Sequence, residues 1–168
     1  MKKEKMKAFL LAFVAMGWLN AQSQAGGDWT YRIKTDQMND GIWHTFTLLA
    51  TEPVGDGVLS GVPRITITCG KGFSDTTMLT PTIVANRMVE LSVDGKRKLK
   101  SWGSSTDGKA YFIQDISAIG ATKEILRSGD FRVGFFDALG HFYVAKFKPA
   151  GIDRAMVAKY CGEKFLKP

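Results

Sequence analysis

Hydrophobic and polar residues alternate along most of the chain, which is the pattern of β-strands that turn one face to a core. Turn-forming Gly, Pro, Asn and Asp residues separate the alternating segments. The segments that open the pattern are Trp29–Asp36, Ile42–Ala50 and the stretch RITITC at Arg64–Cys69. In the last of these, Cys69 falls on the same face as Ile65 and Ile67, so its thiol is expected to point toward the core.

The stretch VELSVDGKRKLKSW predicts a β-hairpin. Val89, Leu91 and Val93 form its apolar face, and Asp94-Gly95 supplies residues that tolerate the positive φ angles of a tight turn. The returning strand divides its residues between two faces. Lys96, Lys98, Lys100 and Trp102 fall on one face, and Arg97, Leu99 and Ser101 fall on the other.

Lys96, Lys98, Lys100 and Trp102 are the candidate binding residues, with two interpretations. A row of lysines beside an exposed tryptophan would make a contact surface for an acidic partner, because aromatic side chains are enriched in binding hot spots. The same lysines on an edge strand would prevent pairing with other chains. The protective role is favoured, and Trp102 belongs to a contact surface only if it is exposed.

The C-terminal half adds helical periodicity to the strands. Ile116, Ile119 and Leu126 are spaced as in a helix that ends before Gly129, and IDRAMVAKYCG (152–162) predicts a second helix. Between them, DFRVGFFDALGHFYVAKFKPAG (130–151) is a hairpin that is apolar on both faces. Such strands are expected in the middle of a core, covered on both sides. The predicted fold is mainly β: an antiparallel β-sandwich or open barrel with two short helices.

The N-terminus has the features of a secretory signal peptide. Four lysines precede an apolar run at 8–19, and small residues follow at 23–25, so cleavage is expected after Ala25. The apolar run is too short to span a membrane, and no membrane span is expected after cleavage. Residues 26–168 then form a single β-rich domain with a formal charge of +4, since four Lys and one Glu are removed from a chain of +7. The expected location is the periplasm or the extracellular space.

Cys69 and Cys161 are the two cysteines of the chain. An even pair in an exported protein indicates one disulfide bond. A metal site that combines both cysteines with His44 and His141 is the alternative. It is disfavoured because metal ligands usually come in close pairs, and these four residues are all isolated.

Recognisable catalytic motifs are absent from the sequence, and no catalytic residue, metal or cofactor is expected. His44 and His141 are interpreted as half-buried strand residues. Asp40, Asp94, Asp107 and Asp137 lie in turn sequences, which explains them without catalysis. Nucleic acid is not an expected partner outside the cytoplasm.

The order of several motifs between Arg64 and Cys161 resembles the small exported proteins associated with bacterial type VI secretion and their uncharacterised periplasmic relatives. The motifs are RITITCGKG, VELSVDGKRKLKSW, STDGKAYFIQD, LRSGDFRVGFFDALG and YVAKFKPAGIDRAMVAKYC. The resemblance implies a β-sandwich with a Cys69–Cys161 disulfide in a Gram-negative envelope protein without known catalysis. Some such proteins are thought to help place the secretion machine at the cell wall.

Two functions are therefore considered first. The first is a non-enzymatic envelope protein that binds another envelope protein or peptidoglycan, for example as a secretion-system accessory. The second is a periplasmic inhibitor of a hydrolase such as lysozyme. Because lysozyme is basic, the inhibitor would need an acidic loop, for which the sequence offers Glu52 and Asp56. A small hydrolase is a more distant third.

Overall fold

The computed structural model describes residues 22–24, 28–36, 41–56, 60–71, 73–85 and 88–167. Most of the predicted signal peptide, including its lysines and its apolar run, lies outside these residues, as does Asp40, one of the acids in turn sequences. Among the described residues, no helix is long and apolar enough to cross a membrane.

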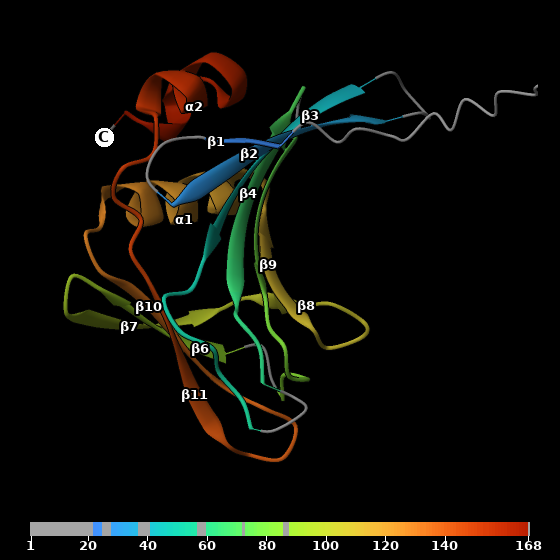
Figure 1. Ribbon diagram of the computed structural model, residues 1–168, viewed down its shortest axis with the longest axis vertical. Coiled ribbons are helices and arrows are strands. Elements are labelled where there is room, and N and C mark those ends of the chain that lie inside the picture. The colour runs from blue at the N-terminus through green and yellow to red at the C-terminus, as the bar shows by residue number, and fades with distance from the viewer. Residues whose placement is uncertain are drawn as a thin grey trace, which may run out of the picture.

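The described strands form two antiparallel sheets (Figure 1). The seven-stranded sheet has the order β1-β2-β3-β4-β5-β9-β8, and the four-stranded sheet has the order β11-β10-β6-β7. The strands of the first sheet are β1 Gln22–Gln24, β2 Trp29–Asp36, β3 Gly41–Leu49, β4 Arg64–Gly70, β5 Phe73–Leu79, β8 Gly103–Ser104 and β9 Ala110–Gln114. Those of the second are β6 Met88–Val93, β7 Lys96–Ser101, β10 Phe131–Phe136 and β11 Phe142–Phe147.

The inner faces of the two sheets share one hydrophobic core. The large sheet contributes residues such as Trp29, Phe46 and Ile67, and the small sheet contributes Leu91 and Phe135, all at most 2% exposed. The sheets remain separate, so the mainly-β prediction is confirmed as a β-sandwich rather than a closed barrel.

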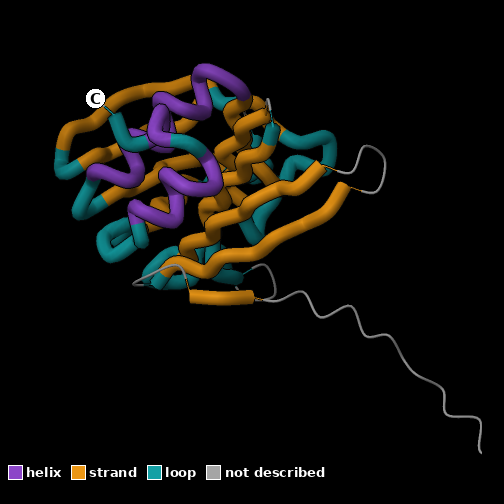
Figure 2. Tube along the Cα trace, turned by 90° about the horizontal axis from the view of Figure 1, so that it is seen from above, coloured by secondary structure: helices purple, strands orange, loops and turns teal. Residues whose placement is uncertain are grey.

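Two helices cover part of the inner face of the seven-stranded sheet. Helix α1, Asp115–Arg127, packs on β5 and β9, and helix α2, Arg154–Cys161, contacts β4. Figure 2 shows both helices gathered at one side of the molecule. The side chain of Asp153 caps α2 by accepting a hydrogen bond from the Met156 N–H at 3.1 Å, and Gly162 ends the helix at a φ of 93°. A 3-10 turn at Glu163–Phe165 follows.

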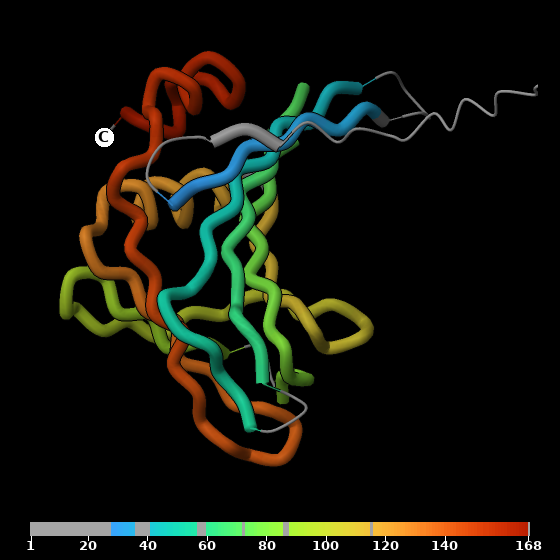
Figure 3. Tube along the Cα trace, in the orientation of Figure 1, coloured from blue at the N-terminus to red at the C-terminus, as the bar shows by residue number. Residues whose placement is uncertain are grey.

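A disulfide bond joins Cys69 in β4 to Cys161 in α2, with the two Cα atoms 5.3 Å apart. The predicted bond is therefore confirmed. In Figure 3 the chain runs from β11 up one side of the molecule to α2, where the bond ties it to the large sheet.

The predicted hairpin of β6 and β7 is present, with Asp94 and Gly95 at φ angles of 48° and 82°. The Asp94 carboxylate also accepts hydrogen bonds from the N–H groups of Gly129 and Asp130, both at 2.9 Å. This turn is consequently fastened to the loop that connects α1 to β10.

Two strand predictions need correction. The sequence MLTPTIVA (78–85) predicts a strand with Pro81 near its start, but β5 ends at Leu79, because proline cannot continue a ladder of hydrogen bonds. The hairpin of β10 and β11 was expected to be covered on both faces. Its inner face is buried, but Phe136, Phe142 and Val144 on the outer face are exposed, and β11 lies at the sheet edge.

Candidate binding surfaces

The three candidate lysines lie on β7, which is an edge strand of the four-stranded sheet. Every residue of β7 is exposed. Lys98 donates to the Glu124 carboxylate on α1 at 2.8 Å, whereas Lys96 and Lys100 have no ion pair among the described residues. The position suits protection of the edge, because lysines discourage pairing with another strand. Binding by these lysines remains a prediction.

Trp102 does not share this exposure. It lies just after β7, and only 1% of its surface is exposed, so it belongs to the core. It continues the face of the lysines, and that face is the inner one, because Lys98 and Lys100 pair with the buried Leu91 and Val89. Trp102 is therefore no part of a surface patch. It instead lines, with Lys100 and Glu124, a hollow of about 320 Å³ between β7 and α1.

The outer face of the four-stranded sheet carries a cluster of exposed apolar side chains, here called the apolar face. These side chains are between 37% and 67% exposed. They are Met88, Leu99, Phe136, Phe142 and Val144. Strand pairing joins them into a surface, because Leu99 pairs with Glu90, Glu90 with Gly134, and Gly134 with Val144.

The ring of Phe142 lies over Gly134, where an added Cβ would come within 2.6 Å of the ring. Phe142 also packs on Phe136, with ring centroids 5.0 Å apart. Beside them is a hollow of about 330 Å³ that also contacts Arg97 and Arg132.

The charges around the apolar face are neutralised within the chain. Arg97 pairs with Glu90 at 3.4 Å, Arg132 with Asp130 at 2.6 Å, and Lys146 with Glu52 at 2.5 Å. Such exposed pairs contribute little to stability. They do, however, leave this side of the sheet with little unbalanced charge, which favours an apolar contact over a purely electrostatic one.

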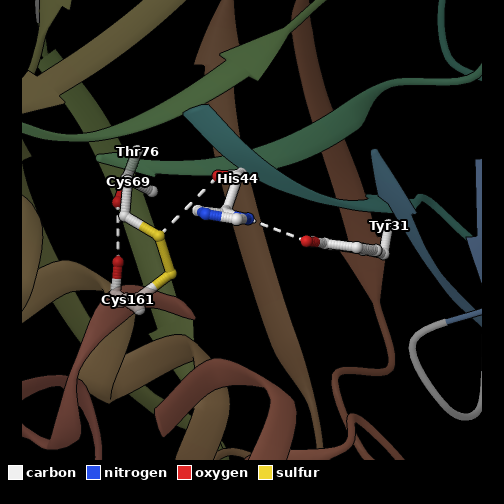
Figure 4. The surroundings of a disulfide bond; sticks show 6 residues. Tyr31, His44, Cys69, Thr76 and Cys161 are labelled. Atoms are coloured by element: carbon white, nitrogen blue, oxygen red, sulfur yellow. Dashed lines mark hydrogen bonds between the residues drawn. A yellow bond between two sulfur atoms is a disulfide. The ribbon is translucent and has the colours of Figure 1, made fainter. Parts of the chain in front are cut away.

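His44 lies beside the disulfide bond, on the inner face of the seven-stranded sheet (Figure 4). The Tyr31 hydroxyl lies 2.7 Å from its Nδ1 atom, and the Tyr160 ring stacks on the imidazole with centroids 4.5 Å apart. Burial lowers the pKa of His44 and raises that of Tyr31 to about 12. His44 is half-buried as predicted, and its neutral form suits this aromatic environment.

His141 differs from the prediction, because it precedes β11 and its side chain is 59% exposed. Its Nδ1 atom lies 3.1 Å from the Asp137 carboxylate. Asp137 also accepts from the N–H groups of Leu139 and His141, so it organises the turn between β10 and β11. The turn role predicted for Asp137 is confirmed.

Potential metal ligands do not cluster in the part of the chain that the structure describes, where no group of three or more His, Cys, Asp or Glu residues is placed to hold an ion. Both cysteines are in the disulfide. His44 and His141 lie in different surroundings, so the alternative metal site built from these four residues does not form.

The acids proposed for an inhibitory loop are engaged within the molecule. Glu52 pairs with Lys146, and Asp56 accepts a hydrogen bond from the Tyr143 hydroxyl at 3.4 Å. Within the described part of this loop, neither of the two acids is left without a partner in the chain.

Comparison with known proteins identifies the fold but no family. No family model matches the sequence, and no curated protein matches it either. The chain is similar to the crystal structure of invasion associated protein B from Bartonella henselae, with a TM-score of 0.53. The identity is 12%, over 81% of this chain and 92% of that chain. At this identity the similarity shows a shared fold alone.

Proposed function

We propose that this protein is an exported, non-enzymatic binding protein of the cell envelope, and that it docks onto another protein through the apolar face. The observation that carries the proposal is the outer face of the β10–β11 hairpin. Its sequence has the apolar pattern of strands covered on both sides, yet the described chain covers only the inner side. A partner protein would supply the missing cover.

The composition of the apolar face supports a protein partner. Isolated exposed hydrophobic residues are ordinary, but a contiguous patch with a polar rim is typical of an interaction site. Phenylalanine and methionine are enriched in such interfaces, while charged groups are depleted at their centres. Here Phe136, Phe142 and Met88 occupy the patch, and the paired arginines lie at its margin.

The disulfide bond and the similar fold agree with an exported protein. Disulfides persist in oxidising compartments outside the cytoplasm. The Bartonella protein is described as invasion associated, which is compatible with a role at the cell surface. Within this proposal, a component of a secretion system is one class of partner, as the resemblance to type VI-associated proteins implies.

Site-specific photocrosslinking in the native host tests the proposal. A photoreactive residue at Leu99 or at Val144 should give one discrete protein adduct after irradiation of intact cells. The matched control carries the same residue at Thr66, which lies on the outer face of the other sheet, and should not give this adduct.

Failure to obtain a discrete adduct at both apolar positions would contradict the proposal, as would the same adduct at Thr66. An adduct of twice the mass of the protein would make the apolar face a contact between two copies of this chain instead.

A further inference from the structure

The outer face of the seven-stranded sheet has a different composition, dominated by threonine. A row of four threonines crosses four adjacent strands, since Thr30 pairs with Thr47, Thr47 with Thr66, and Thr66 with Thr77. Thr45 and Thr68 pair in the next row. These six residues are called the threonine face. All six side chains are half-buried, so each presents part of its surface to solvent.

The hydroxyl groups of the threonine face make only weak contacts with one another. The Thr47 and Thr66 hydroxyls are 3.4 Å apart, and the Thr30 hydroxyl reaches the Thr47 carbonyl at 3.5 Å. Each hydroxyl can both donate and accept a hydrogen bond. The rows therefore present groups that can both donate and accept hydrogen bonds along the face.

Exposed cations flank the rows. Arg32, Lys34 and Arg64 lie on this face and, with four of the threonines, line a hollow of about 480 Å³. Neither Lys34 nor Arg64 has an ion pair among the described residues, in contrast to the arginines beside the apolar face. The hollow contains one acid, Asp28.

A second acid, Asp75, follows Thr68 in its row and accepts a hydrogen bond from the Thr77 hydroxyl at 2.7 Å. Lys34 on β2 and Arg64 at the start of β4, two cations without an ion pair among the described residues, therefore lie away from Asp75.

An aromatic pair continues the face beyond Lys34. Trp43 pairs with Lys34 across the strands, and the ring of Trp43 packs against that of Phe73 with centroids 4.6 Å apart. Both rings are half-buried. Aromatic rings pack on apolar surfaces while leaving their edges to polar groups, and the C–H faces of sugar rings offer such surfaces.

We infer that the threonine face binds an acidic polysaccharide. Its hydroxyls would exchange hydrogen bonds with sugar hydroxyls, Lys34 and Arg64 would contact carboxylate or sulfate groups, and Trp43 would support a sugar ring. A long anionic chain also suits an open sheet face that lacks a closed pocket. This site is separate from the apolar face, so it stands whether or not the proposed protein partner exists.

Binding of defined polymers to the oxidised protein, purified after export, tests the inference. The probes are heparin, which is sulfated, polygalacturonate, which is carboxylated, neutral dextran and a DNA duplex. Heparin and polygalacturonate should bind, with affinity that falls as salt is raised, while dextran should not bind and DNA should bind more weakly than either.

Two charge-matched variants locate the site. K34Q/R64Q should bind both acidic polymers about tenfold more weakly, because two contacts to a polyanion are lost. K96Q/K100Q removes the same charge from β7 and should bind as the wild type does. T47V/T66V keeps the strand-forming shape but removes two hydroxyls, and should weaken binding to polygalacturonate about threefold or more. Circular dichroism should show that all three variants are folded.

Several results would overturn the inference: no binding to either acidic polysaccharide, equal losses in the two charge variants, or tighter binding to DNA. Wild-type affinity in T47V/T66V would also overturn it, because the face would then be merely cationic rather than suited to a glycan.

Discussion

The outer faces of the two sheets are built by the same strand alternation but have opposite chemistry. On the four-stranded sheet, apolar side chains lie exposed and the neighbouring arginines are paired with acids. On the seven-stranded sheet, threonines form rows, and Lys34 and Arg64 are not neutralised by an ion pair among the described residues. The same core holds both faces in place.

This difference between the outer faces shows that the needs of the core do not explain which residues occupy the outward positions of the strands. Burial requires only that inward positions be apolar, and it leaves the outward positions free to vary. One outer face has been filled with residues that water solvates poorly, and the other with hydroxyls and cations. The composition of each outer face therefore indicates a different kind of binding partner.

The largest loss of stability is expected when the disulfide bond is removed. C69S/C161S removes the bond between β4 and α2 and should lower the free energy of unfolding by about 4–5 kcal/mol, because the bond closes a loop of about 93 residues in the unfolded chain. Urea unfolding of the variant and of the oxidised wild type measures the difference. A loss below about 1 kcal/mol would show that packing of α2 holds the region without the bond.

The next largest loss of stability distinguishes the inner face of β10 from its outer face. F135A should cost about 3–5 kcal/mol of unfolding free energy, because Phe135 is fully buried and its truncation leaves a cavity. F136A, one residue along, should cost less than about 1 kcal/mol, because Phe136 is 43% exposed on the apolar face. Urea unfolding of both variants compares the faces directly. Equal losses would mean that the outer side is covered in solution.

The smallest effect concerns pH on the inner side of the large sheet. Burial lowers the pKa of His44 below its usual 6.5, so the unfolded state takes up the proton first. Stability should therefore be complete above about pH 6.5 and decline as the pH falls from there toward the lowered pKa of the folded state. The unfolding free energy should be measured from about pH 7.5 down to about pH 5. It should decline over this range in the wild type, and the decline should be shallower in H44Q.

Y31F is the control for this measurement. It removes the hydroxyl beside His44 but leaves the imidazole buried, so most of the pH dependence should remain. A wild-type stability that stays flat over the same range would show that His44 titrates as freely as in the unfolded chain.

The sequence predicted the elements whose inward residues are plainly apolar. The β6–β7 hairpin, both helices and the disulfide were recognised because Asp94-Gly95, the helical spacing and the cysteine pair carry strong local signals. The start of β5, before Met78, was not predicted because its inward residues include Ser74 and Thr76. These polar residues are tolerated in the core, where the Thr76 hydroxyl lies 2.8 Å from that of Thr122 on α1.

The candidate surfaces were predicted less well. The lysines of β7 are exposed and their binding role stays a prediction, whereas the burial of Trp102 depended on which face of β7 turns toward the core. The threonine face could not be recognised, because each threonine alone indicates only strand propensity. The four residues of one row come from four strands, and only the register of those strands aligns them.

The position of the disulfide also sets an order of events during biogenesis. The second cysteine, residue 161, is made after both sheets and α1, so the covalent closure cannot precede synthesis of nearly all the structural elements. With two cysteines in the chain, no incorrect intramolecular pairing exists. Formation of this disulfide therefore needs no isomerase to correct the pairing.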